Sequence, residues 1–168
     1  MRIISSAAVV CCCVFSSNAA SDTQKRLVSD LSIKTEKINC PSDLNESDIR
    51  TLVSQEATKQ GVDEKLALAI ADNESANGAK QNSEKGARGP MQLTPDTAAL
   101  YGVADICDAS ENVRGGISYI KDLSAEFHGN VLLVAAAYNA GPDRVYQARG
   151  VPAISETVRY VAAVTNHY

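Results

Sequence analysis

Apolar residues recur at helical spacing along most of this 168-residue chain, and this periodicity restricts its fold more than any other feature. The clearest stretch follows Ser110, where Val113, Ile117, Ile120 and Leu123 fall on one face of a helix. No run alternates apolar and polar residues over a length that could form the core of a sheet. The periodicity therefore predicts a mostly α-helical single domain.

Capping residues, glycines and prolines divide the rest of the chain into further helices. Gly115 and Gly116 weaken the helix after Ser110, which indicates that another helix approaches it closely. Residues 76–92 interrupt the helical pattern with glycines and a proline, so a small irregular or β-ribbon segment is expected there. The other expected helices run from an N-cap at Ser47 to Gly61, from an N-cap at Asp63 through Glu74, from Pro95 to near Gly102, from Val131 to Asn139 behind an N-cap at Asn130, from Pro142 to Gly150, and from an N-cap at Ser155 to the C-terminus.

Residues 1–20 have the pattern of a secretory signal peptide. The segment begins with Arg2, continues with small and apolar residues, and ends with small residues suited to signal peptidase. A lipid anchor on Cys11 is the weaker alternative, because the residues before it match a lipoprotein signal poorly. No later apolar stretch reaches the roughly 18 residues that a membrane span needs. We therefore expect export to the periplasm and no membrane span.

Signal cleavage would leave Cys40 and Cys107 as the cysteines of the mature chain. An even pair in an oxidising compartment indicates a disulfide, with two buried free thiols as the alternative. Two thiols and two distant histidines are too few ligands for zinc, so we expect no metal. Residues 21–39 are polar and predict an N-terminal arm, and residues 40–168 form the predicted domain.

The charge of the chain argues against nucleic acid as its main partner. The chain has sixteen basic and twenty acidic residues, a formal net charge of −4, and no run of five or more basic residues. Phosphate binding needs a clustered basic surface, which this composition does not favour. Since tryptophan is absent, any ligand groove must depend on tyrosines, amides and the backbone.

One carboxyl stands where the helical pattern expects an apolar residue. Leu66, Ile70 and Glu74 lie at i, i+4 and i+8, so Glu74 continues the buried stripe of its helix. Loss of solvation favours the neutral carboxyl and raises its pKa, which suits a general acid near neutral pH. The alternative is an exposed glutamate where the helix frays.

Three other segments carry polar residues that a ligand could use. Gln92 lies in the glycine-rich stretch 86–95, where the backbone can approach a ligand closely. Tyr138 and Asn139 stand at the end of a helix of small residues, and Glu156 and Tyr160 share one face of the last helix. Each segment by itself is also explained by a turn, a helix cap or a surface pair.

The order of these segments resembles the soluble lytic transglycosylase family, whose domain is lysozyme-like. The resemblance is collinear from about Gln60 to Val164, and the twelve-residue step from Glu74 to Gly86 matches the family's usual spacing. The segments that carry it are Gly61 to Asp63, Glu74-Ser75, Gly86 to Pro95, Asn112 to Gly115, Ala137 to Pro142, and Gly150 to Pro152 through Glu156-Thr157 and Tyr160-Val161.

The resemblance implies a role for each matching residue. Glu74 would be the family's single acid and base, with Ser75 as its hydrogen-bonding neighbour. Gln92 would contact the acetamido group of a sugar, and Met91 would shape the groove beside it. The remaining groove residues implied are Tyr138 and Asn139 near the acid, and Glu156 and Tyr160 on the opposite wall.

The resemblance implies non-hydrolytic cleavage of peptidoglycan glycan strands, with 1,6-anhydro ends as the product and no cofactor. A lysozyme-type hydrolase and a non-catalytic glycan-binding module stay open as alternatives. Since the predicted mature domain is small and exported, it also resembles specialised transglycosylases that open the wall for secretion or conjugation machinery. General wall turnover and an effector role are the competing biological settings.

Overall fold

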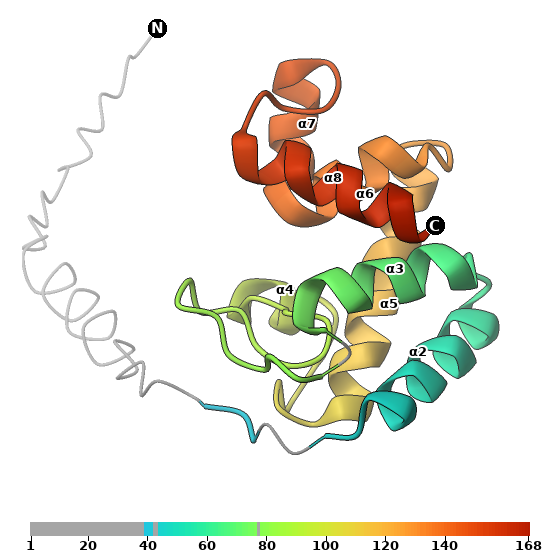
Figure 1. Ribbon diagram of the computed structural model, residues 1–168, viewed down its shortest axis with the longest axis vertical. Coiled ribbons are helices and arrows are strands. Elements are labelled where there is room, and N and C mark those ends of the chain that lie inside the picture. Colours follow the sequence, from blue (N-terminus) through green and yellow to red (C-terminus); the bar gives the residue numbers. More distant parts are fainter. Residues whose placement is uncertain (1–38, 42–43, 77) are drawn as a thin grey trace, which may run out of the picture. The chain divides into compact units, whose positions relative to one another are not determined.

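The computed structural model describes residues 39–168 except 42, 43 and 77 (Figure 1). This part of the chain is helical, which confirms the predicted fold class. No helix among these residues combines the length and hydropathy needed to cross a membrane. The predicted signal peptide and, apart from Asn39, the predicted arm lie outside the described residues. The helices are α2 (Glu46–Gln60), α3 (Glu64–Ser75), α4 (Pro95–Leu100), α5 (Ala109–Glu126), α6 (Val131–Ala140), α7 (Pro142–Ala148) and α8 (Ser155–His167).

Most predicted helix ends agree with the structure, and two N-caps differ. Asp63 caps α3 and Asn130 caps α6 through side-chain hydrogen bonds, as predicted. Helix α2 starts earlier than expected, because the side chain of Asn45 accepts a hydrogen bond from the backbone N–H of Ser47. Ser155 is the first residue of α8 and makes no capping hydrogen bond, because the preceding turn places Ile154 at the N-cap.

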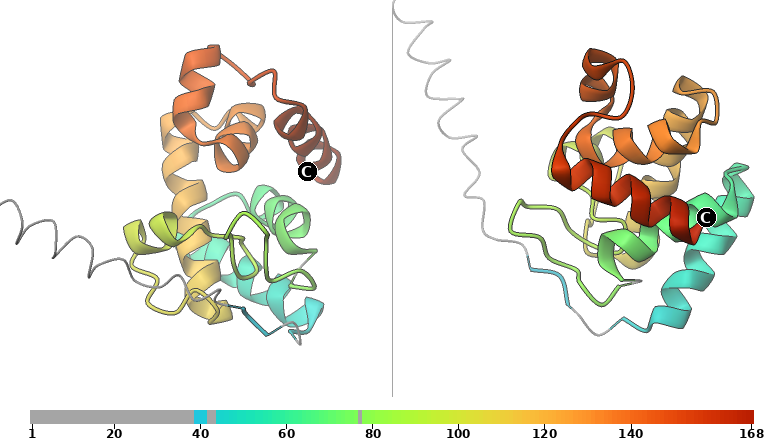
Figure 2. Two further views of the ribbon diagram at one scale, coloured as in Figure 1. Left: turned by 90° about the vertical axis from the view of Figure 1, so that its left-hand side faces the viewer. Right: turned by 45° about the horizontal axis from the view of Figure 1, so that its top comes forward.

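Helix α5 runs along the domain and connects its two ends (Figure 2). It packs against α2 at one end and against α6 at the other, while α7 and α8 pack on α6. Helix α3 packs against both α2 and α8, so it lies between the two ends of the domain. The apolar stripe of α5 is almost completely buried, as its periodicity predicted, at Val113, Ile117, Ile120 and Leu123.

The segment between α3 and α4 is irregular, as predicted from its glycines. Among the described residues of this segment, β-structure is limited to isolated bridges that pair Arg88 with Asn82 and with Leu93. A disulfide joins Cys40 to Cys107, with their Cα atoms 5.1 Å apart, which confirms the predicted pair. The side chain of Asn82 accepts from the backbone N–H of Cys40 at 2.7 Å and donates to its carbonyl at 2.8 Å. The start of the domain is therefore fastened to this segment.

The close approach predicted at Gly115 and Gly116 exists, but the partner is not a helix. A Cβ atom on Gly115 would lie 2.4 Å from Cγ2 of Val103, and one on Gly116 would lie 2.6 Å from Cβ of Met91. Val103 and Met91 both belong to irregular segments. The prediction of a helix partner was wrong, because glycine spacing reports a close contact without identifying the element that makes it.

Candidate active site

Helix α3 carries Glu74 at the end of its buried face. Leu66 is 4% exposed and Ile70 is completely buried, and Glu74 continues this face one turn later as a half-buried carboxyl. The helix ends directly afterwards, where Ala76 adopts a left-handed conformation with φ of 49°. The apolar stripe of the sequence therefore holds a carboxyl at the edge of the core.

Tyr160 on α8 makes the closest described contact to this carboxyl. Its hydroxyl donates to Oε1 of Glu74 at 2.6 Å, a short hydrogen bond between residues 86 positions apart. The packing of α3 against α8 brings the two side chains together. Glu74 and Tyr160, which lie in separate segments of the sequence, are thus hydrogen-bonded neighbours in the site.

The pKa of Glu74 is raised from 4.5 to about 7. Burial is the main cause, because a desolvated carboxylate loses the water that stabilises its charge. The hydrogen bond from Tyr160 lowers the pKa, since it stabilises the anion, and the negative charge of Glu156 raises it. A carboxyl with this pKa exchanges its proton readily at neutral pH, so it can serve as both acid and base.

Tyr138 on α6 lies near Glu74 and contacts the segment before α4. Its hydroxyl donates to the backbone carbonyl of Met91 at 2.9 Å. Burial, together with the nearby Glu74 carboxylate, raises the pKa of Tyr138 well above its ordinary value. The hydroxyl therefore keeps its proton and stays a hydrogen-bond donor.

Tyr119 on α5 is a neighbour that the sequence analysis missed. Its ring centroid lies 5.1 Å from that of Tyr138 and 5.6 Å from that of Tyr101. Such tilted pairs are a favourable arrangement of aromatic rings. No local pattern marks Tyr119, because only the packing of α5 against α6 brings it beside Tyr138.

Gln92 keeps its side-chain amide within its own segment. Its Nε2 donates to the carbonyl of Gly89 at 2.8 Å and to the carbonyl of Lys80 at 3.2 Å. The residue has a φ of 47°, which is uncommon for a side chain other than glycine. The contact of Gln92 with a sugar stays a prediction.

Ser75 and Met91 are buried beside the candidate site. Both side chains are completely buried, so neither presents surface to a sugar. The hydroxyl of Ser75 donates to the carbonyl of Pro90 at 2.7 Å and accepts from the backbone N–H of Gly78 at 2.8 Å. The roles that the resemblance implies for Ser75 and Met91 stay predictions.

Asn139 and Glu156 make contacts that link separate elements. Oδ1 of Asn139 accepts from the hydroxyl of the buried Thr157 at 2.9 Å, which connects α6 with α8. Glu156 is exposed, and Nζ of Lys85 lies 2.8 Å and 2.6 Å from its two carboxylate oxygens. The sequence analysis missed Lys85, which lies in the irregular segment and has no local pattern that would identify its partner.

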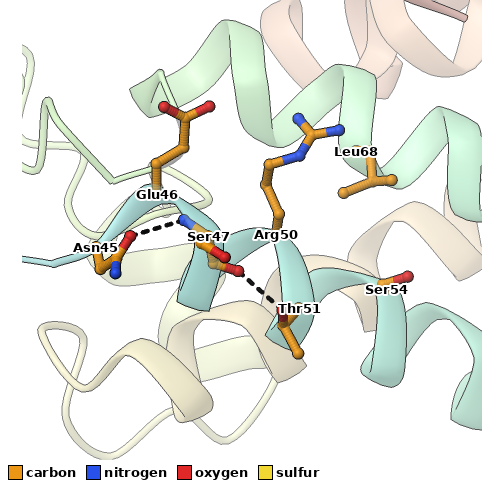
Figure 3. A pocket seen from close by; sticks show the side chains of 7 residues that line it. All are labelled: Asn45, Glu46, Ser47, Arg50, Thr51, Ser54 and Leu68. Carbon is orange, nitrogen blue, oxygen red and sulfur yellow. Dashed lines mark hydrogen bonds between the residues drawn. The ribbon is translucent and has the colours of Figure 1, made fainter.

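A pocket opens in another part of the domain, on the face between α2 and α3 (Figure 3). Arg50 extends from α2 toward α3, and Leu68 of α3 lines the opposite side. None of the predicted site residues lines this pocket. The candidate active site is therefore defined by the contacts of Glu74 itself.

Comparison with known proteins identifies the family to which this chain belongs. Residues 51–157 match the family model described as "Transglycosylase SLT domain", and the chain belongs to this family. This family membership confirms the resemblance seen in the sequence.

Two solved structures are similar to the chain. An inactive mutant of lytic transglycosylase Slt from Pseudomonas aeruginosa is 28% identical with a TM-score of 0.62, and the match covers 89% of this chain and 28% of that one. The 70 kDa soluble lytic transglycosylase SLT70 from Escherichia coli is 28% identical with a TM-score of 0.61, covering 70% of this chain and 23% of that one. The matches thus span about a quarter of each relative's length.

Proposed function

We propose that this chain is a peptidoglycan lytic transglycosylase, which cleaves the β-1,4 bond between N-acetylmuramic acid and N-acetylglucosamine without adding water. The observation that carries the proposal is Glu74, a half-buried carboxyl with a pKa raised to about 7 and a tyrosine hydroxyl on one oxygen. Membership in the transglycosylase family supports the same chemistry.

Glu74 performs both proton transfers of the reaction. Its carboxyl first protonates the glycosidic oxygen while the bond from this oxygen to C1 of the muramoyl residue breaks. The carboxylate then takes the proton of the C6 hydroxyl while O6 forms a bond with C1, which closes the 1,6-anhydro ring and restores the acid. Tyr160 stabilises the intermediate carboxylate by hydrogen bonding. Proton transfer of this kind typically contributes about 10² to 10⁴ in rate.

Two other carboxylates, Asp72 and Glu156, have contacts that support this reaction over hydrolysis. Most glycoside hydrolases place a second carboxylate across the scissile bond as base or nucleophile. Asp72 lies two positions from Glu74 on another face of α3, where its carboxylate is 3.3 Å from Nδ1 of His167. The carboxylate of Glu156 is ion-paired with Lys85. Each is thus engaged with a partner of its own.

Analysis of the product tests the proposed function. Purified sacculi are digested, treated with borohydride and analysed by mass spectrometry. We expect muropeptides with 1,6-anhydro-N-acetylmuramic acid ends, which are one water lighter than hydrolysis products and resist reduction. The C6 hydroxyl outcompetes water because it is already held near C1. Reducible ends would identify a hydrolase, and no soluble product from folded protein would favour a glycan-binding module.

The Glu74→Gln variant shows whether this residue is the acid. The amide keeps the shape of the side chain but has no proton to transfer, so product release should fall by at least about 10². Glu84→Gln is the matched control, since it also replaces a carboxyl but in an exposed position. Near-normal release by folded Glu74→Gln protein would mean that another group is the acid.

We extend the proposal to the cellular setting. The signal peptide predicted for residues 1–20 supports an activity in the periplasm, where a secretion or conjugation apparatus requires an opening in the wall. N-terminal sequencing of protein from the periplasmic fraction tests the cleavage. Loss of secretion or conjugation on deletion, restored by the wild type and not by Glu74→Gln, tests the role.

A further inference from the structure

Asn112 is a polar residue inside the core stripe of α5. Its side chain is completely buried, next to Val113, which is 1% exposed. A buried amide is unfavourable unless its polar atoms find hydrogen-bond partners. The position would suit an apolar residue for packing alone, so the partners of Asn112 indicate why an amide stands there.

All described hydrogen bonds of this amide go to backbone atoms of irregular segments. Oδ1 accepts from the backbone N–H of Met91 at 2.8 Å. Nδ2 donates to the carbonyl of Arg88 at 3.0 Å and to that of Ile106 at 2.9 Å. A single side chain thus holds the two ends of the segment 88–91 and the residue before Cys107.

The segment 88–92, which we call the site loop, lies directly against α5. A Cβ atom on Gly89 would be 2.2 Å from Nδ2 of Asn112, and Gly89 adopts a φ of 76° that favours glycine. A Cβ atom on Gly116, one turn along the helix, would be 2.6 Å from Cβ of Met91. Glycines on both partners therefore make room for this contact.

The site loop is also bonded to the elements that surround Glu74. The carbonyl of Pro90 accepts from the hydroxyl of Ser75, the residue after Glu74. The carbonyl of Met91 accepts from the hydroxyl of Tyr138. A displacement of the loop on α5 would consequently move the end of α3 and the hydroxyl of Tyr138 together.

We propose that Asn112 is a positioning residue, which holds the site loop so that Tyr138 and the end of α3 keep their places around Glu74. It contacts no substrate and acts through its hydrogen bonds to Met91 and Arg88. This inference rests on the proposed function, since it assigns a residue to that same site. A purely stabilising role for Asn112 is the alternative that the experiment must separate.

The test compares Asn112→Ala with Val53→Ala, a truncation at a fully buried position on α2 that has no hydrogen bond to the site loop. Both variants lower the melting temperature, and kcat and KM are measured for each on soluble uncrosslinked glycan strands below that temperature. We expect Asn112→Ala to lower kcat at least tenfold, because loop displacement misplaces the reacting groups. Val53→Ala should stay within about twofold of wild type. If Asn112→Ala does not fold, Asn112→Ser, which replaces the amide by a smaller hydroxyl group, is measured by the same criterion.

A double-variant cycle then asks whether Asn112 acts through Tyr138. If the loop transmits its effect, Asn112→Ala combined with Tyr138→Phe loses about as much kcat as the more damaging single variant. If the fold-losses in kcat of the two single variants multiply in the double variant, the proposal is overturned. Equal kcat for Asn112→Ala and Val53→Ala would also overturn it. Absence of product from wild-type protein would instead refute the proposed function, so the two failures are distinguishable.

Discussion

Replacing Glu74 by glutamine should make the protein more stable and do so only at high pH. In the unfolded chain this carboxyl ionises near its ordinary value of 4.5, whereas in the folded protein burial raises the pKa to about 7. Between these pH values the unfolded chain has lost the proton and the folded protein retains it. The free energy of unfolding therefore falls as the pH rises, and the full penalty is present above pH 7.

The raised pKa sets the size of this effect. The difference between 4.5 and about 7 corresponds to about 3 kcal/mol of destabilisation at pH 8. This is an upper value, because Glu74 is half-buried and water relaxes part of the penalty. Glutamine carries no charge at any pH, so the gain from Glu74→Gln should approach this value at pH 8 and vanish at pH 4. The melting temperature at pH 8 should rise by up to roughly 10 °C.

Thermal unfolding followed by circular dichroism at pH 4 and pH 8 measures the effect. Glu156→Gln is the control, because the ion pair with Lys85 lowers the pKa of Glu156 and its loss should give no gain at pH 8. If Glu74→Gln raises the melting temperature equally at both pH values, packing and not charge burial is responsible. An unchanged melting temperature of Glu74→Gln at pH 8 would refute the argument that burial raises the pKa of this carboxyl.

Three further substitutions test other parts of the structure. Tyr160→Phe removes the hydrogen bond that lowers the pKa of Glu74, so the alkaline limb of the pH–rate profile should move up by about one pH unit. Gly116→Ala should lower the free energy of unfolding in urea by about 1 to 3 kcal/mol, because its Cβ would meet a buried side chain at 2.6 Å. The double variant Cys40→Ser with Cys107→Ser should lower it by up to about 4 kcal/mol, since the disulfide closes a loop of 67 residues.

Each of these expectations has an outcome that contradicts it. An alkaline limb that stays in place or moves to lower pH in Tyr160→Phe would show that the tyrosine does not stabilise the carboxylate. Gly150→Ala is the matched control for Gly116→Ala, because no atom lies within 4 Å of its Cβ position. Equal stability of these two glycine variants would contradict the close contact between α5 and the site loop. Unchanged urea unfolding of the serine variant would mean that the disulfide contributes little.

The sequence by itself determined the features that depend on residues a few positions apart. The stripe of α5, the N-caps Asp63 and Asn130 and the position of Glu74 at the end of an apolar face all follow from helical periodicity and capping. The disulfide was predicted from the expected signal cleavage, which would leave an even pair of cysteines, and the structure has this pair joined. These features are local or compositional, so one chain without its fold is enough to predict them.

Tertiary structure alone decided which side chains meet. Tyr160 reaches Glu74 only because α3 packs against α8, and Ser75 points into the core although its neighbour Glu74 does not. The glycine of α5 that makes room for Met91 was visible in the sequence, but its partner was not. Contacts between residues 15 to 86 positions apart depend on how helices and loops pack together, and that packing is set by the whole core and not by any local pattern.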